Sequence, residues 1–419
     1  MLSSLTRYSL YLLLVFTPLA IGSVQGWAIS VMHLVTLLGL TAVLVEKSLA
    51  WSWEWVKTPL DKPILCISIL CLLSSAFSVH TYTSMWSFIL LVNYVVIFYL
   101  MIHTHGTRSQ LRRLVYLIIG SAALISIMGL LKNFCGNPFQ WWDYTDFQAT
   151  PDRLSSTFGN ANHLAGYMEM TLPVLLGLLV TGFRGIKLVL IIGLVIPLFV
   201  ALLLSLSRGG WLGAAVGLCF MCIALLLNRF FQSKKLVLAL TSGCVVMAFI
   251  VLSSTTVVKR IKTVEQMGNI PNLNARITVW DGVAEMIKDH PVLGIGPGTF
   301  ATVFTQYQPP GLLSRYFAAH NDYLQVTAEA GLALIPVMAW MIIAFFAHGF
   351  KKLNNPSRLV RCTTLGAMSG VTAILIHSIF DFNLHIPANA ILFTVLAAIV
   401  VSPAPVTEGN GQDVQKIRG

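Results

Sequence analysis

Long apolar stretches recur along the whole chain and are separated by short polar segments. Many are about 20 residues long, the length that an α-helix needs to cross a bilayer core of roughly 30 Å. The pattern therefore predicts an all-α polytopic membrane protein with about twelve transmembrane helices. The predicted spans are residues 8–24, 28–46, 63–79, 86–103, 112–132, 161–181, 186–205, 209–228, 235–254, 325–349, 360–380 and 386–402.

Two polar connections, residues 133–160 and 255–324, are much longer than the others. In the longer one, apolar residues at helical spacing over Leu273–Lys288 predict an amphipathic helix on the membrane surface. The segment after it, Asp289–Phe300, is rich in Gly and Pro, which predicts a tight turn, so we expect this loop to be structured. The expected organisation is nine helices in 1–254, a loop in 255–324, three helices in 325–402 and a disordered cytoplasmic tail in 403–419.

Composition and charge agree with a membrane protein and predict its orientation. Only 10% of the residues are charged, whereas soluble domains carry roughly 25%. If both termini are cytoplasmic, 18 of the 27 lysines and arginines fall on the cytoplasmic side, as the positive-inside rule requires. Both long loops then face outward, which in a bacterium means the periplasm and an inner (cytoplasmic) membrane location. The net charge of +11 reflects this topology and does not indicate nucleic-acid binding.

Two arginines on the periplasmic side are candidate anion ligands. Arg208 stands between two predicted spans, where an arginine is costly and indicates a partner. Gly209 and Gly210 follow it, and their backbone N–H groups are expected to approach an anion closely at the start of a helix. Arg276 lies on the polar side of the predicted loop helix. Together the two guanidinium groups are suited to holding a diphosphate. The alternatives are that Arg208 is a snorkelling arginine that fixes a helix end and that Arg276 is an ordinary solvated arginine.

A histidine lies where the long loop enters the next predicted span. His320 is followed by Asn321 and Asp322, either of which is a good helix cap. Capping would fix His320 at the boundary between water and membrane, where it is suited to act as a general base. Asp322 is expected to orient the imidazole ring. The alternative is that His320 is a bystander of the helix cap.

The roles of two further polar clusters are not decided by the sequence. His163 follows two asparagines at the start of a predicted span, and His377, Asp381 and His385 flank the last external turn. A proton relay and a capped helix end are both compatible with that turn. The sequence contains no D-x-D, P-loop, G-x-S-x-G or H-E-x-x-H motif, so we expect neither a metal ion nor a cofactor.

Three segments in this order resemble the O-antigen ligase and polymerase superfamily of bacterial envelope glycosyltransferases. They are SRGGWLG, ARITVWDGVAEMIKDHPVLGIGPGTF and AHNDYLQVTAEAGL. The resemblance implies a GT-C-like, metal-independent enzyme whose donor is a glycan on undecaprenyl diphosphate. It also implies that Arg208 and Arg276 bind the diphosphate, that His320 is the catalytic base and that the reaction inverts the anomeric carbon.

The resemblance leaves the acceptor open. We favour an O-antigen ligase that transfers the glycan to a hydroxyl of a lipid A-core acceptor. A polymerase would use the same donor and another glycan as acceptor. An anion transporter is a third alternative, but the predicted spans are nearly free of charge, with Glu169 as the main exception.

Overall fold

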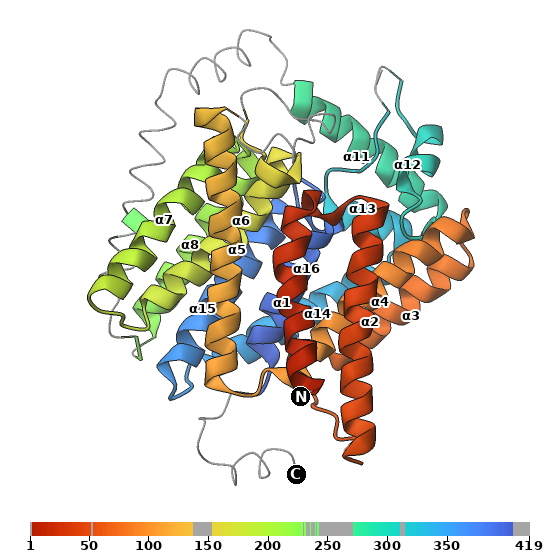
Figure 1. The fold of residues 1–419 in the computed structure, drawn as a ribbon. Coiled ribbons are helices and arrows are strands. Elements are labelled where there is room, and N and C mark those ends of the chain that lie inside the picture. Colours follow the sequence, from red (N-terminus) through yellow and green to blue (C-terminus); the bar gives the residue numbers. More distant parts are fainter. Residues whose placement is uncertain are drawn as a thin grey trace.

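The computed structural model describes residues 2–51, 53–136, 153–228, 230–231, 235, 239, 241–242, 271–310 and 315–404, and of 271–275 only the backbone. Over these residues the regular elements are all helices (Figure 1). They are α1 (Leu2–Leu19), η1 (Ile21–Ser23), α2 (Gly26–Leu49), α3 (Asp61–Ala76), α4 (Thr81–Thr104), α5 (Arg108–Cys135), η3 (Ser156–Phe158), α6 (Ala161–Leu179), α7 (Ile186–Leu204), α8 (Arg208–Leu227), α11 (Pro271–Asp289), α12 (Phe300–Val303), η4 (Phe304–Gln306), α13 (Asp322–Ala330), α14 (Leu334–Lys352), α15 (Arg358–His377), η5 (Asn383–His385) and α16 (Pro387–Val401).

Seven of the described helices are long and apolar enough to cross a membrane, so the chain is a multi-pass membrane protein. They are α2, α4, α5, α7, α8, α14 and α15. Helices α1, α3, α6 and α16 occupy further predicted spans but are shorter or less apolar. The predicted span 235–254 and the tail from residue 405 lie outside the described residues, apart from isolated positions within the span.

Helix α6 lies at the centre of the bundle and packs against α8 and α15. Its side chains are almost all buried, so the helix can carry Glu169 without exposing that carboxyl to lipid. Small residues bring the backbones together. A Cβ added at Gly213 of α8 would lie 2.6 Å from the Ala373 carbonyl oxygen, and one at Gly370 of α15 would lie 2.4 Å from that of Met170. Glycine is therefore what allows these helices to touch.

The predicted span 325–349 is not one continuous helix. The chain forms the short helix α13, stops at Gly331, and begins the membrane-length helix α14 at Leu334. Gly331 has φ +85°, and a Cβ there would lie 2.1 Å from the Val292 carbonyl oxygen. Only glycine fits both conditions, and the apolar pattern alone did not reveal this break.

The described part of the predicted loop, residues 271–310 and 315–324, is structured; residues 255–270 and 311–314 lie outside the described residues. Helix α11 covers residues 271–289, close to the predicted 273–288. The Gly-rich turn after α11 is hydrogen-bonded to α13 and to the connection between α3 and α4. Ile295 N–H donates to the Ala328 carbonyl at 3.0 Å, and Val79 N–H donates to the Ile295 carbonyl at 3.2 Å. A small apolar core that includes Val283, Phe300 and Phe304 joins α11 and α12 to α13.

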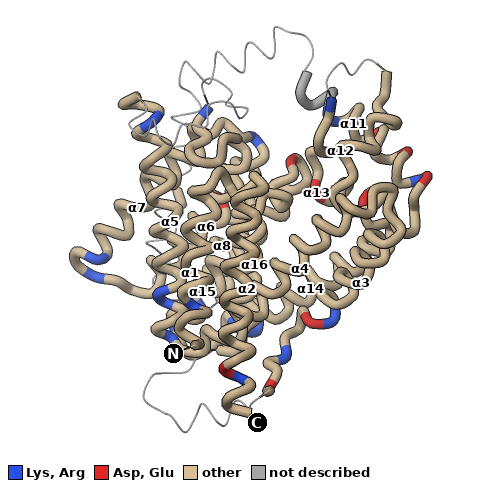
Figure 2. The backbone as a smooth tube through the Cα atoms, turned by 45° about the vertical axis from the view of Figure 1, so that its right-hand side comes forward, with Lys and Arg blue, Asp and Glu red and all other residues tan. Residues whose placement is uncertain are grey.

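The two ends of the bundle differ. The N-terminus lies at the end opposite α11 and α12 (Figure 1). At the N-terminal end, Arg7 donates to the Thr104 carbonyl at the end of α4, and Lys352 binds the end of α16. Lysines and arginines gather at this end, as Figure 2 shows. The arrangement agrees with a topology in which the long loop lies across the membrane from the N-terminus.

Candidate active site

The turn that follows α15 brings together segments that are far apart in the sequence. At its centre lies Asp381, whose side chain is 2% exposed. One oxygen, Oδ1, accepts hydrogen bonds from His320 Nδ1 at 3.1 Å and from the Phe382 N–H at 2.9 Å. The other, Oδ2, accepts from Asn162 Nδ2 at the start of α6. Asp381 is thus a buried carboxylate that holds the candidate histidine in place.

His320 is fixed by its neighbours on both sides. Trp280 Nε1 of α11 donates to the Ala319 carbonyl at 2.9 Å, and the Ala319 N–H donates to Gln325 Oε1 at 3.0 Å. Asn321 caps α13 by accepting from the Leu324 N–H at 3.1 Å, as predicted. His320 itself has φ +49°, a left-handed conformation that costs energy for a side chain with a Cβ and that often marks a functional site.

The protonation pattern of His320 follows from its contact with Asp381. A carboxylate can only accept, so Nδ1 carries the proton and Nε2 of the neutral ring keeps a lone pair. The ring is 30% exposed, and Nε2 has no hydrogen-bond partner among the described residues. His320 therefore presents an accessible proton acceptor, which is the arrangement a general base needs.

The prediction that Asp322 orients the His320 ring is wrong. Asp322 Oδ2 accepts from Ser378 Oγ at 2.7 Å and from the Leu384 N–H at 3.2 Å, while Oδ1 binds His385 Nδ1 at 2.7 Å. Successive side chains at a helix N-terminus point in different directions. Asp322 therefore contacts the turn between α15 and α16 and does not contact His320, two residues before it.

The charge of Asp381 is stabilised by what surrounds it. Burial on its own would raise the pKa of Asp381, but the hydrogen bond from His320 holds that pKa below its ordinary value. The group therefore stays ionised across the neutral range and keeps accepting the His320 proton.

Arg276 is not an ordinary solvated arginine. Its Nη1 donates to the Phe380 carbonyl at 2.6 Å, and its Nη2 lies 3.9 Å from Asp381 Oδ2. The side chain is 26% exposed. The guanidinium group has five N–H donors, so several stay available to a ligand while one holds the turn.

Arg208 is the first residue of α8 and is exposed, without a polar partner among the described residues. The next residue packs on the same turn: a Cβ added at Gly209 would lie 2.6 Å from His377 Cδ2 and 3.5 Å from Phe380 Cβ. One part of the prediction is wrong, because the Gly210 N–H donates to Ser207 Oγ at 3.2 Å and is not open to an anion. Arg208, Arg276 and His320 thus border one turn.

Further polar residues surround the turn, and sequence reasoning did not pair them. Glu169 Oε1 of α6 lies 2.9 Å from His377 Nδ1, and both side chains are buried. Arg153 Nε donates to the Ser205 carbonyl at 2.8 Å, and its Nη2 donates to Asn162 Oδ1. In the sequence these residues were visible only as two polar clusters, around residues 160–163 and 377–385. The clusters are more than 200 residues apart, so the sequence did not indicate that they contact each other.

A large apolar cavity opens on the other side of α15. Its volume is about 390 Å³, and it extends from Gly298, Asp322 and His385 toward Phe345. The walls come from α3, α4, α13, α14, α15 and α16. Its described lining residues include none from α7 or α8, the helices on either side of Arg208.

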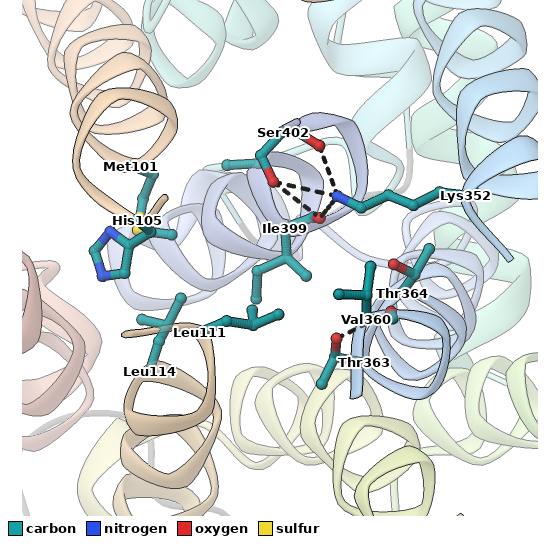
Figure 3. Close-up of a pocket in the computed structure, with 11 residues that line it drawn as sticks. Met101, His105, Leu111, Leu114, Lys352, Val360, Thr363, Thr364, Ile399 and Ser402 are labelled. Carbon is teal, nitrogen blue, oxygen red and sulfur yellow. Dashed lines mark hydrogen bonds between the residues drawn. The ribbon is translucent and has the colours of Figure 1, made fainter. Parts of the chain in front are cut away.

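A second, much smaller pocket lies at the N-terminal end of the bundle (Figure 3). Lys352 reaches across it and donates to the carbonyl oxygens of Ile399 and Ser402, both at 2.7 Å. These are among the last carbonyls of α16, which have no partner inside their own helix. The lysine therefore caps α16, and the role of this pocket is structural.

Comparison with known families supports the superfamily predicted from the motifs. Residues 192–338 match the family model described as O-antigen ligase. The match includes Arg208, Arg276 and His320 but ends before Asp381. No curated protein matches the chain significantly.

Proposed function

We propose, from the premise that this chain belongs to the O-antigen ligase-like superfamily, that it is an O-antigen ligase-type glycosyltransferase. The family implies a glycan donor and an acceptor, and so an enzyme of the ligase or glycosyltransferase type. In our proposal the donor is a glycan on undecaprenyl diphosphate and the acceptor is a hydroxyl of lipid A-core. The site would face the periplasm, with both termini in the cytoplasm, in a GT-C-like enzyme of the inner membrane.

The observation that carries the proposal is the His320–Asp381 pair, with Arg276 Nη2 3.9 Å from Asp381 and with Arg208 next to the Gly209 that packs against Phe380 of the same turn. Nε2 of His320 takes the proton from the acceptor hydroxyl as its oxygen attacks the anomeric carbon. The bond between that carbon and the diphosphate breaks, and the diphosphate leaves with the electron pair. Attack from the opposite face inverts the configuration. Arg208 and Arg276 stabilise the charge that grows on the leaving group, without a metal ion.

The surroundings suit a lipid-linked donor. The apolar cavity beside Asp322 and His385 can take the part of the isoprenoid chain nearest the diphosphate. Helix α11, which carries Arg276 and binds the Ala319 carbonyl through Trp280, covers the His320 loop from outside. This cover would exclude water, which otherwise competes with the acceptor and hydrolyses the donor.

The test is glycan transfer by the purified, full-length protein. It is incubated with a lipid-diphosphate glycan and either lipid A-core or a second donor molecule, and the products are identified by mass spectrometry. A lipid A-core product supports a ligase, whereas a longer lipid-linked glycan alone identifies a polymerase. Absence of both products contradicts the proposed function.

The proposed base is tested separately. His320→Ala should abolish the product and leave donor binding largely intact, since the arginines remain. His80→Ala is the matched control, because His80 is exposed at the start of α4. Retained turnover in His320→Ala would remove that residue from the chemistry.

A further inference from the structure

Two histidine–aspartate pairs cross between the same two segments. His320 binds Asp381 at 3.1 Å, and His385 binds Asp322 at 2.7 Å. In both pairs Nδ1 faces the carboxylate, which fixes the proton on Nδ1. The proposed base uses the first pair, and the mechanism leaves the second pair without a role.

The second pair faces a different space. His385 and Asp322 both line the apolar cavity of about 390 Å³, at the end nearest the Gly-rich turn. The His385 side chain is 29% exposed, and its Nε2 has no hydrogen-bond partner among the described residues. Asp322 is held by Ser378 and the Leu384 N–H, so it fixes the ring rigidly. An imidazole edge therefore stands open at the mouth of an otherwise apolar cavity.

The local charges favour a protonated ring. Burial on its own would lower the pKa of His385, but the hydrogen bond to Asp322 and the negative charges of Asp322 and Glu329 raise it above its ordinary value. The described titratable groups that contact His385 or line this cavity are Asp322, Tyr323 and Glu329 of α13, Cys71 of α3 and Tyr94 of α4.

We propose that His385 is a further binding residue for the donor, one that holds the diphosphate where it joins the lipid chain. The inference rests on the proposed function for the identity of the donor. A polyprenyl diphosphate has an apolar chain that ends in an anionic group, which matches an apolar cavity that ends in a cationic N–H donor. Asp322 is the positioning residue, because it acts on the ligand only through His385.

The proposal predicts that donor binding depends on pH through His385. The imidazolium of His385 donates a charge-assisted hydrogen bond below its pKa and loses it as the pH rises through that value. Polyprenyl diphosphate should therefore bind more tightly at low pH, by about tenfold. In His385→Gln this advantage should disappear, and the difference between the two profiles cancels the titration of the phosphate itself.

The experiment measures binding of polyprenyl diphosphate to the full-length protein in nanodiscs from about pH 5 to about pH 9. Inorganic pyrophosphate and polyprenyl monophosphate are the comparison ligands. A His385-dependent step with the lipid diphosphate but not with pyrophosphate supports a site that needs the chain. The same step with both supports recognition of the diphosphate itself.

His385→Lys keeps a cation that does not titrate in this range, so it should bind the lipid diphosphate tightly at low and at high pH. His80→Ala, at an exposed histidine at the start of α4, should keep the wild-type profile. If His385→Gln and wild type share one affinity and one pH profile, the proposal is overturned. Binding is measured without turnover. A failure to transfer glycan would therefore refute the proposed function, while the binding profiles would still show whether His385 contacts the lipid diphosphate.

Discussion

Replacing Asp381 with asparagine tests the proposed base most directly. The Asp381 carboxylate accepts N–H groups on both oxygens, from His320 and Phe382 on one side and from Asn162 on the other. An amide has a single accepting oxygen, so its NH₂ group must face N–H donors whichever way it turns. When it faces His320, the ring is driven to the tautomer with the proton on Nε2. That nitrogen can then no longer accept a proton from the acceptor hydroxyl.

The expected loss of kcat follows from the hydrogen bond between His320 and Asp381. A hydrogen bond to a charged group contributes about 1.5–3 kcal/mol, and each 1.36 kcal/mol is about a tenfold change in rate. Asp381→Asn should therefore lower kcat about 10- to 100-fold. In serine proteases the corresponding change costs about 10⁴-fold through the wrong tautomer, which sets the upper limit. Donor affinity should be unchanged or tighter, since Asp381 no longer competes for Arg276 3.9 Å away.

The assay is steady-state glycan transfer with both substrates varied, together with donor binding and thermal unfolding of the same preparations. Asp281→Asn is the matched control, because Asp281 is exposed on α11. An unchanged kcat in Asp381→Asn would refute the assigned role. A loss of donor affinity with kcat intact would instead identify Asp381 as part of the donor site.

Three further outcomes are expected. Arg208→Ala should weaken donor binding and turnover together, whereas Arg184→Ala, at an exposed arginine before α7, should change neither; equal donor affinities would refute the diphosphate role. Trp280→Phe loses the hydrogen bond to Ala319 and should lower kcat about tenfold with donor affinity retained, as measured by the same kinetics. Gly213→Ala places a Cβ 2.7 Å from Glu169 Oε2 and should destabilise the fold by about 1–3 kcal/mol, seen as a lower Tm, while Gly193→Ala, in open space, should not.

Much of the fold could be predicted because membrane helices carry their signal locally. Apolar length gives the helices, and hydrophobic periodicity gives α11 almost to its ends. The cap at Asn321 is also local, since it depends on residues one turn away. The break at Gly331 was missed because the apolar pattern continues across it.

The site could be predicted only in part. Each of Arg208, Arg276 and His320 has a local reason to be noticed, but their partners come from distant segments. His320 and Asp381 are 61 residues apart, and no periodicity connects them. Asp322 was predicted as the partner of His320 because it is the nearer carboxylate in sequence, and this prediction was wrong. Similarly, the cavity depends on six helices, and no single apolar stretch contains the information that places it.

The distance along the chain between His320 and Asp381 has a consequence for biogenesis. Helices α14 and α15 lie between them, so the ribosome completes His320 well before its carboxylate partner exists. Domains emerge and fold from the N-terminus first during synthesis. A nascent chain with every earlier segment in the bilayer would still have an unsupported imidazole, and it would become active only when the final helical hairpin is inserted. Under the proposed function, incompletely made copies would then be unable to turn over the donor.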